Sequence, residues 1–84
     1  MDGAKPIREN VAGAPYGIGA WARVRQIVDD TASTLFVGLI GRVAYLEYSC
    51  GCGQSFPGDP MIGVLFADGR TEEFWQEELE DMKL

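Results

Sequence analysis

Hydrophobic and polar residues alternate over several short stretches of this chain, a pattern typical of β-strands that bury one face. After residue 20 the alternation predicts strands over 21–28, 40–48, 61–67 and 71–75. The apolar residues Trp21, Val24 and Val28 also fit one face of a helix, so the first stretch has an alternative. The pattern as a whole predicts a mainly β fold.

The stretch 40–48 has two alternating sets of residues. One predicted face holds Arg42, Ala44, Leu46 and Tyr48, and the other holds Val43, Tyr45 and Glu47. In 61–67, the residues Ile62, Val64 and Phe66 share one face, while Gly63 marks a bulge or a close crossing.

Asp68-Gly69 is a strong hairpin signal, because glycine accepts the positive φ of a tight turn. Two interpretations of the following residues compete. Trp75, Leu79 and Met82 have helical spacing, whereas a hairpin requires a strand directly after its turn. We favour a strand over 71–75, a 3₁₀ turn over 76–79 and a short last strand.

Glycine and proline divide the rest of the chain. Residues 1–20 contain six of them and no sustained period, which predicts an N-terminal arm ahead of a folded domain at 21–84. Apolar residues such as Ile7 and Val11 indicate that the arm packs on the domain or on a neighbouring subunit. The glycine-rich loop 49–60 is long for so small a domain and is the first place to look for function.

The order of these signals resembles that of the small SH3-like β-barrels, including KOW-type and nitrile hydratase β-chain-like domains. The residues that carry the resemblance are Val24-Arg25, the Gly38/Gly41 bend, the hairpin segment 64–69, Phe74 and the segment 77–80. The likeness covers about residues 19–84 and extends to stand-alone barrels of bacterial genomes and mobile gene cassettes. It implies a barrel of about five strands with a 3₁₀ turn or short helix near the C-terminus. Because such barrels include RNA binders, electron-transfer accessory subunits and scaffolds, it implies no single activity.

The composition narrows the classes of function. A domain of 84 residues buries only about 60 to 65% of its unfolded surface, so we expect stabilisation by homo-oligomer formation. The net charge of −6 argues against a nucleic-acid partner, and the absence of histidine removes the usual general base and imidazole ligand. We therefore expect no enzymatic activity. The start of the chain lacks an apolar signal segment, so we expect a cytoplasmic protein without a membrane partner.

Cys50 and Cys52 are separated by one glycine and are the sharpest local feature. They could form a redox pair or half of a thiolate site, in which case zinc would be held between subunits. The alternative is a pair of tolerated loop thiols, and our expectation is no cofactor.

Acidic residues gather near the end of the chain, where residues 68–84 sum to −5. A basic partner surface is one explanation, and a solvated sheet edge is the other. The acidic surface predicted here consists of Glu72, Glu73, Glu77 and Glu78.

Aromatic residues form the last candidate. Trp75, Tyr45, Tyr48 and Phe56 are expected to form a contact patch near the long loop, together with Trp21. In the alternative, Trp21 and Trp75 complete the core.

The sequence thus favours a non-enzymatic interaction or scaffold module that self-associates through an aromatic surface. The alternatives are a thiol-based metal or redox protein and a binder of a cationic or apolar small ligand.

Overall fold

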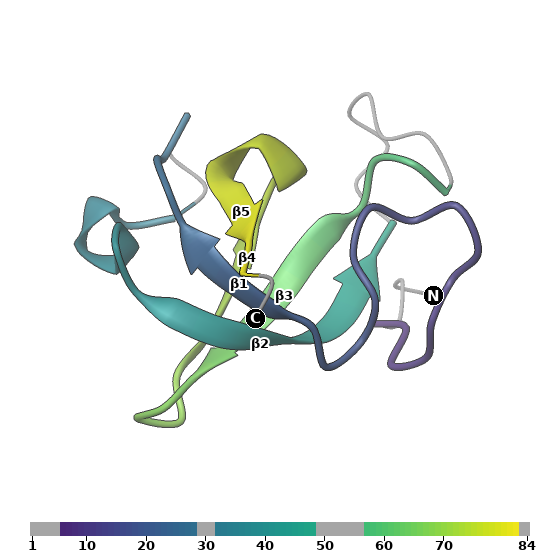
Figure 1. Cartoon of the computed structure of the whole chain (residues 1–84), viewed down its shortest axis with the longest axis horizontal. Coiled ribbons are helices and arrows are strands. Elements are labelled where there is room, and N and C mark those ends of the chain that lie inside the picture. Colours follow the sequence, from purple (N-terminus) through teal and green to yellow (C-terminus); the bar gives the residue numbers. More distant parts are fainter. Residues whose placement is uncertain (1–5, 29–31, 49–56, 83–84) are drawn as a thin grey trace, which may run out of the picture.

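The computed structural model describes residues 6–28, 32–48 and 57–82. Within them, five antiparallel strands form one sheet in the order β4-β3-β2-β1-β5 (Figure 1). The strands are β1 (Trp21–Val24), β2 (Ile40–Glu47), β3 (Met61–Phe66), β4 (Thr71–Phe74) and β5 (Leu79–Asp81), and the 3₁₀ turns are η1 (Thr34–Phe36) and η2 (Gln76–Glu78). In this part of the chain, neither turn has the length or apolar character to cross a bilayer.

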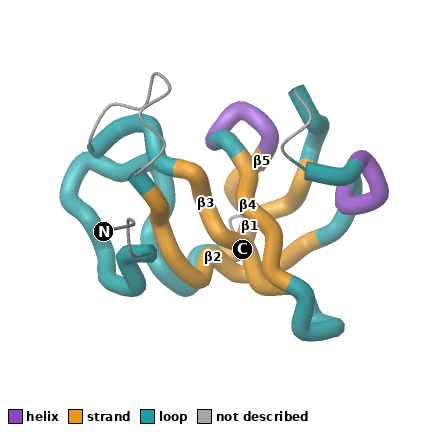
Figure 2. Tube along the Cα trace, turned by 180° about the vertical axis from the view of Figure 1, so that it is seen from behind, coloured by secondary structure: helices purple, strands orange, loops and turns teal. Residues whose placement is uncertain are grey.

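The predicted mainly β fold with a 3₁₀ turn near the C-terminus is confirmed. After the hairpin the chain forms β4, then η2, then β5, so the helical interpretation of this region is wrong (Figure 2). The helical interpretation of 21–28 is wrong as well, although β1 ends at Val24. The Arg25 N–H still donates to the carbonyl of Glu78 at 2.8 Å, in register with the pairing of β1 and β5, so the contact with this part of the chain reaches one residue beyond β1.

The β3–β4 hairpin follows from Asp68-Gly69. Gly69 adopts a φ of 91°, in the left-handed region that favours glycine. Its N–H donates to the Phe66 carbonyl, and the Phe66 N–H donates to the Arg70 carbonyl, both at 2.9 Å. The local turn signal therefore fixes the pairing of β3 with β4.

A β-bulge interrupts β2. Val43 pairs with Val64 and Tyr45 pairs with Gly63, so Ala44 is the extra residue. Leu46 beyond the bulge is buried, whereas Arg42 before it is exposed. The predicted shared face of Arg42 and Leu46 is therefore wrong, because one inserted residue moves all later side chains to the opposite face.

The core fills the inner face of the sheet. Phe74 is fully buried, and its ring meets those of Phe36 and Phe66 edge-on, with centroids 5.9 and 6.1 Å away. The buried cluster consists of Ala22, Val24, Phe36, Val43, Leu46, Ile62, Val64, Phe66, Phe74 and Leu79. Ile62, Val64 and Phe66 thus share the inner face as predicted. Residues of the arm, among them Val11 and Ile18, pack against this cluster.

The Glu78 carboxylate links η2 to the residues that follow β1 through two hydrogen bonds. Its carboxylate is fully buried and accepts the N–H of Trp75 at 2.8 Å and the N–H of Val28 at 2.9 Å. Both bonds are charge-assisted, and they satisfy donors that would otherwise lack an acceptor. Glu78 therefore does not belong to the acidic surface expected from the sequence.

We predict that Glu78→Ala lowers the free energy of unfolding by about 2 to 4 kcal/mol, because it leaves two N–H groups without their acceptor. Urea unfolding followed by tryptophan fluorescence measures the change. The exposed neighbour provides a matched control, since Glu77→Ala should change stability by less than about 0.5 kcal/mol. Equal urea midpoints for the two variants would show that the buried carboxylate does not hold η2.

Candidate interaction surface

Exposed apolar side chains concentrate on one part of the molecule. Among the described residues, six of the seven exposed large apolar side chains lie on β1, the η1–β2 segment and β3. Four of the six line two adjoining hollows: Trp21, Leu39, Ile40 and Leu65, which are 42, 37, 44 and 44% exposed. Three of these four, Trp21, Ile40 and Leu65, share one face of the sheet by their strand register, and we call these three the outer apolar surface.

The first hollow lies on the outer face of the sheet and has a volume of about 230 Å³. Trp21 pairs with Arg42 across β1 and β2, and Arg42 pairs with Leu65 across β2 and β3. The Arg42 guanidinium lies 4.8 Å from the centre of the Trp21 ring, and its Nε donates to the Gly19 carbonyl at 3.3 Å. This stacking holds the indole in place at the rim of the hollow.

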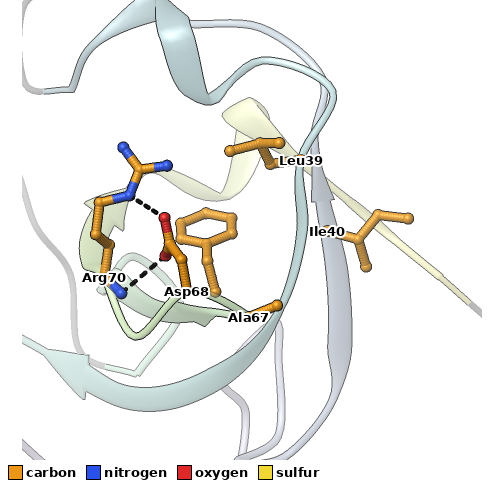
Figure 3. A pocket seen from close by; sticks show the side chains of 6 residues that line it. Leu39, Ile40, Ala67, Asp68 and Arg70 are labelled. Atoms are coloured by element: carbon orange, nitrogen blue, oxygen red, sulfur yellow. Dashed lines mark hydrogen bonds and ion pairs between the residues drawn. The ribbon is translucent and has the colours of Figure 1, made fainter.

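The second hollow has a volume of about 220 Å³ and lies between the start of β2 and the β3–β4 hairpin (Figure 3). Leu39 reaches over it from one side, whereas Ile40 points away on the other side of the strand. Asp68 and Arg70 form the opposite wall and are joined by an ion pair. The hollow is therefore apolar on the side of Leu39 and charged on the side of the hairpin.

Arg70 stabilises the ionised form of the Asp68 carboxyl. The Arg70 backbone N–H donates to Asp68 Oδ1 at 3.0 Å, and this bond, followed by the bond from the Arg70 side chain, lowers the pKa of the Asp68 carboxyl below its usual value. The Arg70 guanidinium also lies 5.0 Å from the centre of the Phe36 ring. Both charges of the pair are thus fixed beside the hollow.

Charged residues of both signs form the rim: Arg42, Asp68 and Arg70 line the hollows, and Arg23 lies beside them through its pairing with Ile40. Arg23 forms an ion pair with Glu80 at 3.2 Å, and Arg70 pairs with Asp68. Together with Arg42, these five residues sum to +1, whereas the whole chain carries −6. The outer apolar surface is therefore bordered by a less acidic region than the chain as a whole.

Comparisons of this chain with protein-family models, with curated proteins and with solved structures returned no match. Its function is therefore inferred from the geometry and chemistry of its own residues.

The aromatic residues predicted as one patch are distributed over the molecule. Trp21 lines the first hollow, but neither hollow is lined by Tyr45, Tyr48 or Trp75. The Tyr48 hydroxyl donates to the Pro57 carbonyl at 2.7 Å, and Trp75 is half-buried. Phe56 lies outside the described residues.

Leu39, Ile40 and Leu65 are not among the functional residues predicted from the sequence. For Leu65 the signal was present, because a residue between the inward-facing Val64 and Phe66 must face outward. For Leu39 and Ile40 the exposure depends on where η1 ends and β2 begins, which alternation alone did not reveal.

The thiol and metal predictions stay predictions, because Cys50 and Cys52 lie outside the described residues. Across 6–28, 32–48 and 57–82, no three His, Cys, Asp or Glu side chains are grouped so that they could hold a metal ion.

The remaining acidic residues have different surroundings. Glu72 and Glu73 lie on the edge strand β4, and Glu77 is exposed on η2. Glu73 Oε2 accepts the Tyr45 hydroxyl at 2.7 Å, and Glu72 Oε1 accepts the Glu73 N–H at 3.1 Å. Glu73 is thus part of a specific polar contact as well as of the sheet edge.

Tyr45 reaches Glu73 by lying across Gly63 on β3. A Cβ atom on Gly63 would come within 2.3 Å of the Tyr45 ring, so a residue without a side chain is required there. Burial, and then the hydrogen bond to Glu73, raise the pKa of the Tyr45 hydroxyl well above its usual value of 10.0. The hydroxyl therefore remains a donor to Glu73 throughout the physiological range.

We predict that the protein loses stability as the pH rises above about 10. The pKa of Tyr45 is higher in the folded than in the unfolded state, so its contribution is complete below the unfolded pKa of 10.0 and is lost as the pH rises towards the folded pKa. Urea unfolding between about pH 9 and about pH 11 measures the slope. Tyr45→Phe should flatten it without abolishing it, because burial also raises the pKa of Tyr16 and Tyr48. An unchanged slope in Tyr45→Phe would show that the Tyr45 hydroxyl does not cause the loss of stability at high pH.

Proposed function

We propose that this protein is a non-enzymatic interaction module that associates with a second copy of itself through the outer apolar surface. The observation that carries the proposal is the concentration of Trp21, Ile40 and Leu65 on one face of the sheet, each residue more than a third exposed, with Leu39 lining the adjoining hollow. Clustered apolar side chains with a stacked tryptophan and arginine are typical of the centre of a protein–protein interface.

The charges at the rim favour a second copy as the partner. Two chains of charge −6 repel each other, and the repulsion is smallest where the local charge is least negative. In a two-fold contact the same surface meets itself, so a self-complementary rim needs charges of both signs. The pairs Arg23–Glu80 and Asp68–Arg70 supply both signs, and each is able to exchange partners across the contact.

The stacking of Arg42 on Trp21 supports the same function. A guanidinium that already holds the indole reduces the side-chain freedom lost on binding. Leu65 lies beside this pair in the sheet, so a partner that covers one of the three residues covers all of them. Trp21 and Leu65 are accordingly assigned to the centre of the interface.

The fold is interpreted as SH3-like. The strand order β4-β3-β2-β1-β5 and the 3₁₀ turn between β4 and β5 support this interpretation, which rests on architecture. A small barrel of this kind gains from association, because its own core is small and its outer face has apolar side chains still to bury.

We predict that Leu65→Ser weakens self-association at least about tenfold, because it places a hydroxyl at the centre of the contact. Leu35→Ser is the matched control, since Leu35 is 82% exposed and lines neither hollow, and it should leave association unchanged. Sedimentation equilibrium from about 1 to about 200 µM measures the dissociation constant.

Two results would contradict the proposal. A wild-type protein that stays monomeric over this whole range would remove self-association. Equal dissociation constants for Leu65→Ser, Leu35→Ser and wild type would show that the copies meet on another surface.

A further inference from the structure

The N-terminal arm acts as a short extra strand on β2. Ile7 pairs antiparallel with Leu46, with the Ile7 N–H donating to the Leu46 carbonyl at 2.8 Å and the Leu46 N–H donating back at 2.9 Å. β1 pairs with β2 at Ile40–Arg42, on the other half of the same edge. The arm therefore covers the part of the edge that lies beyond the bulge (Figure 1).

The register of this pairing places Arg8 opposite Tyr45. The Arg8 guanidinium lies 5.3 Å from the centre of the Tyr45 ring, and the hydroxyl of that ring donates to Glu73. An aromatic face next to a carboxylate attracts a cation through both the ring quadrupole and the negative charge. The Tyr45 ring thus forms a site for a guanidinium, with the Glu73 carboxylate at its hydroxyl end, and Arg8 lies over the ring.

Two adjacent residues of the arm, Ile7 and Arg8, make different kinds of contact with β2. Ile7 pairs with Leu46, a fully buried residue of the inner face, while Arg8 lies on the outer face over Tyr45. The site therefore fits an extended segment in which an apolar residue is followed by arginine. The backbone hydrogen bonds fix the strand, and the two side chains determine its register.

A hydrogen bond from Ile18 to Asn10 attaches the arm to the domain two residues after Arg8. Asn10 Oδ1 accepts the Ile18 N–H at 2.7 Å, so the chain beyond Asn10 is held to the domain. The segment before Asn10 is attached through the bridge at Ile7 and the contact of Arg8 with Tyr45. These few interactions can be broken without opening the core.

We propose that the arms of two copies exchange, so that Ile7 and Arg8 of one copy bind Leu46, Tyr45 and Glu73 of the other. A second copy brings the same two residues to the same site, and each hydrogen bond broken within a chain forms again between chains. The exchange uses the end of β2 beyond the bulge, whereas the proposed function uses the outer apolar surface near its start. It therefore goes beyond that function and can fail independently of it.

A charge-swapped pair of full-length variants tests the exchange. Arg8→Glu sets a second carboxylate against Glu73, and Glu73→Arg sets a second guanidinium against Arg8, so each variant alone has mismatched charges. In an equimolar mixture, exchanged arms match at both sites. We expect the ratio of mixed to unmixed dimers, measured by native mass spectrometry, to rise about tenfold above its statistical value, the effect of replacing two unfavourable surface charge contacts by two favourable ones.

Three controls fix the interpretation. The double variant Arg8→Glu/Glu73→Arg restores the match within one chain, so mixing it with wild type should not enrich the mixed dimer. The charge-swapped pair should remain enriched when both copies also carry Leu65→Ser, which separates this site from the outer apolar surface. Raising the salt concentration should reduce the enrichment, because the matched charges lie at the surface.

Two outcomes would overturn the exchange. A statistical ratio of mixed and unmixed dimers, or monomers alone, would show that the arm stays in its own chain.

A second experiment supplies the other outcome: a capped peptide of residues 6–12 is added to full-length Arg8→Ala, and the NMR signals of Tyr45 and Glu73 are followed. Binding of this peptide without a mixed dimer would show that the site accepts the segment but not from a second copy.

Discussion

The extra residue at Ala44 in β2 is the constraint on which both faces of the sheet depend. Because it shifts the register between Val43 and Tyr45, Leu46 enters the core while Tyr45 is placed on the outer face. Without the inserted residue, the strict alternation of the sequence would direct Leu46 outward and turn Tyr45 and Glu47 towards the core. The bulge thus creates the core contact and the outer tyrosine in one step.

Gly63 is the partner of this bulge on β3. A side chain there would collide with the Tyr45 ring, so its absence lets the ring cross β3 and reach Glu73 on β4. Three strands are thereby connected on the outer face by one tyrosine. The arm adds a fourth segment through Arg8, so the contacts near the end of β2 form a continuous group.

The two halves of β2 have different neighbours and, in our proposals, different roles. Before the bulge β2 is paired on both edges, and its outer face carries apolar residues and a stacked arginine. Beyond the bulge one edge is paired by the short arm, and the outer face carries a tyrosine and a carboxylate. Before the bulge, burial of apolar side chains favours an apolar contact with a partner. Beyond the bulge, backbone hydrogen bonds and opposite charges favour the binding of an extended segment that carries an arginine.

The sequence by itself determined the order of β3, its hairpin, β4, η2 and β5, because Asp68-Gly69 and the alternation around it are local signals. It also implied that Leu65 faces outward. Only the tertiary structure decided that Glu78 is buried, since the two N–H groups that donate to its carboxylate, those of Val28 and Trp75, come from separate parts of the chain. The bulge at Ala44 and the seating of Arg8 on Tyr45 were decided in the same way. The spacing of hydrophobic residues indicates whether a stretch of chain is helix or strand. The face of the sheet on which a side chain lies also depends on the register of its strand with strands that are distant in the sequence.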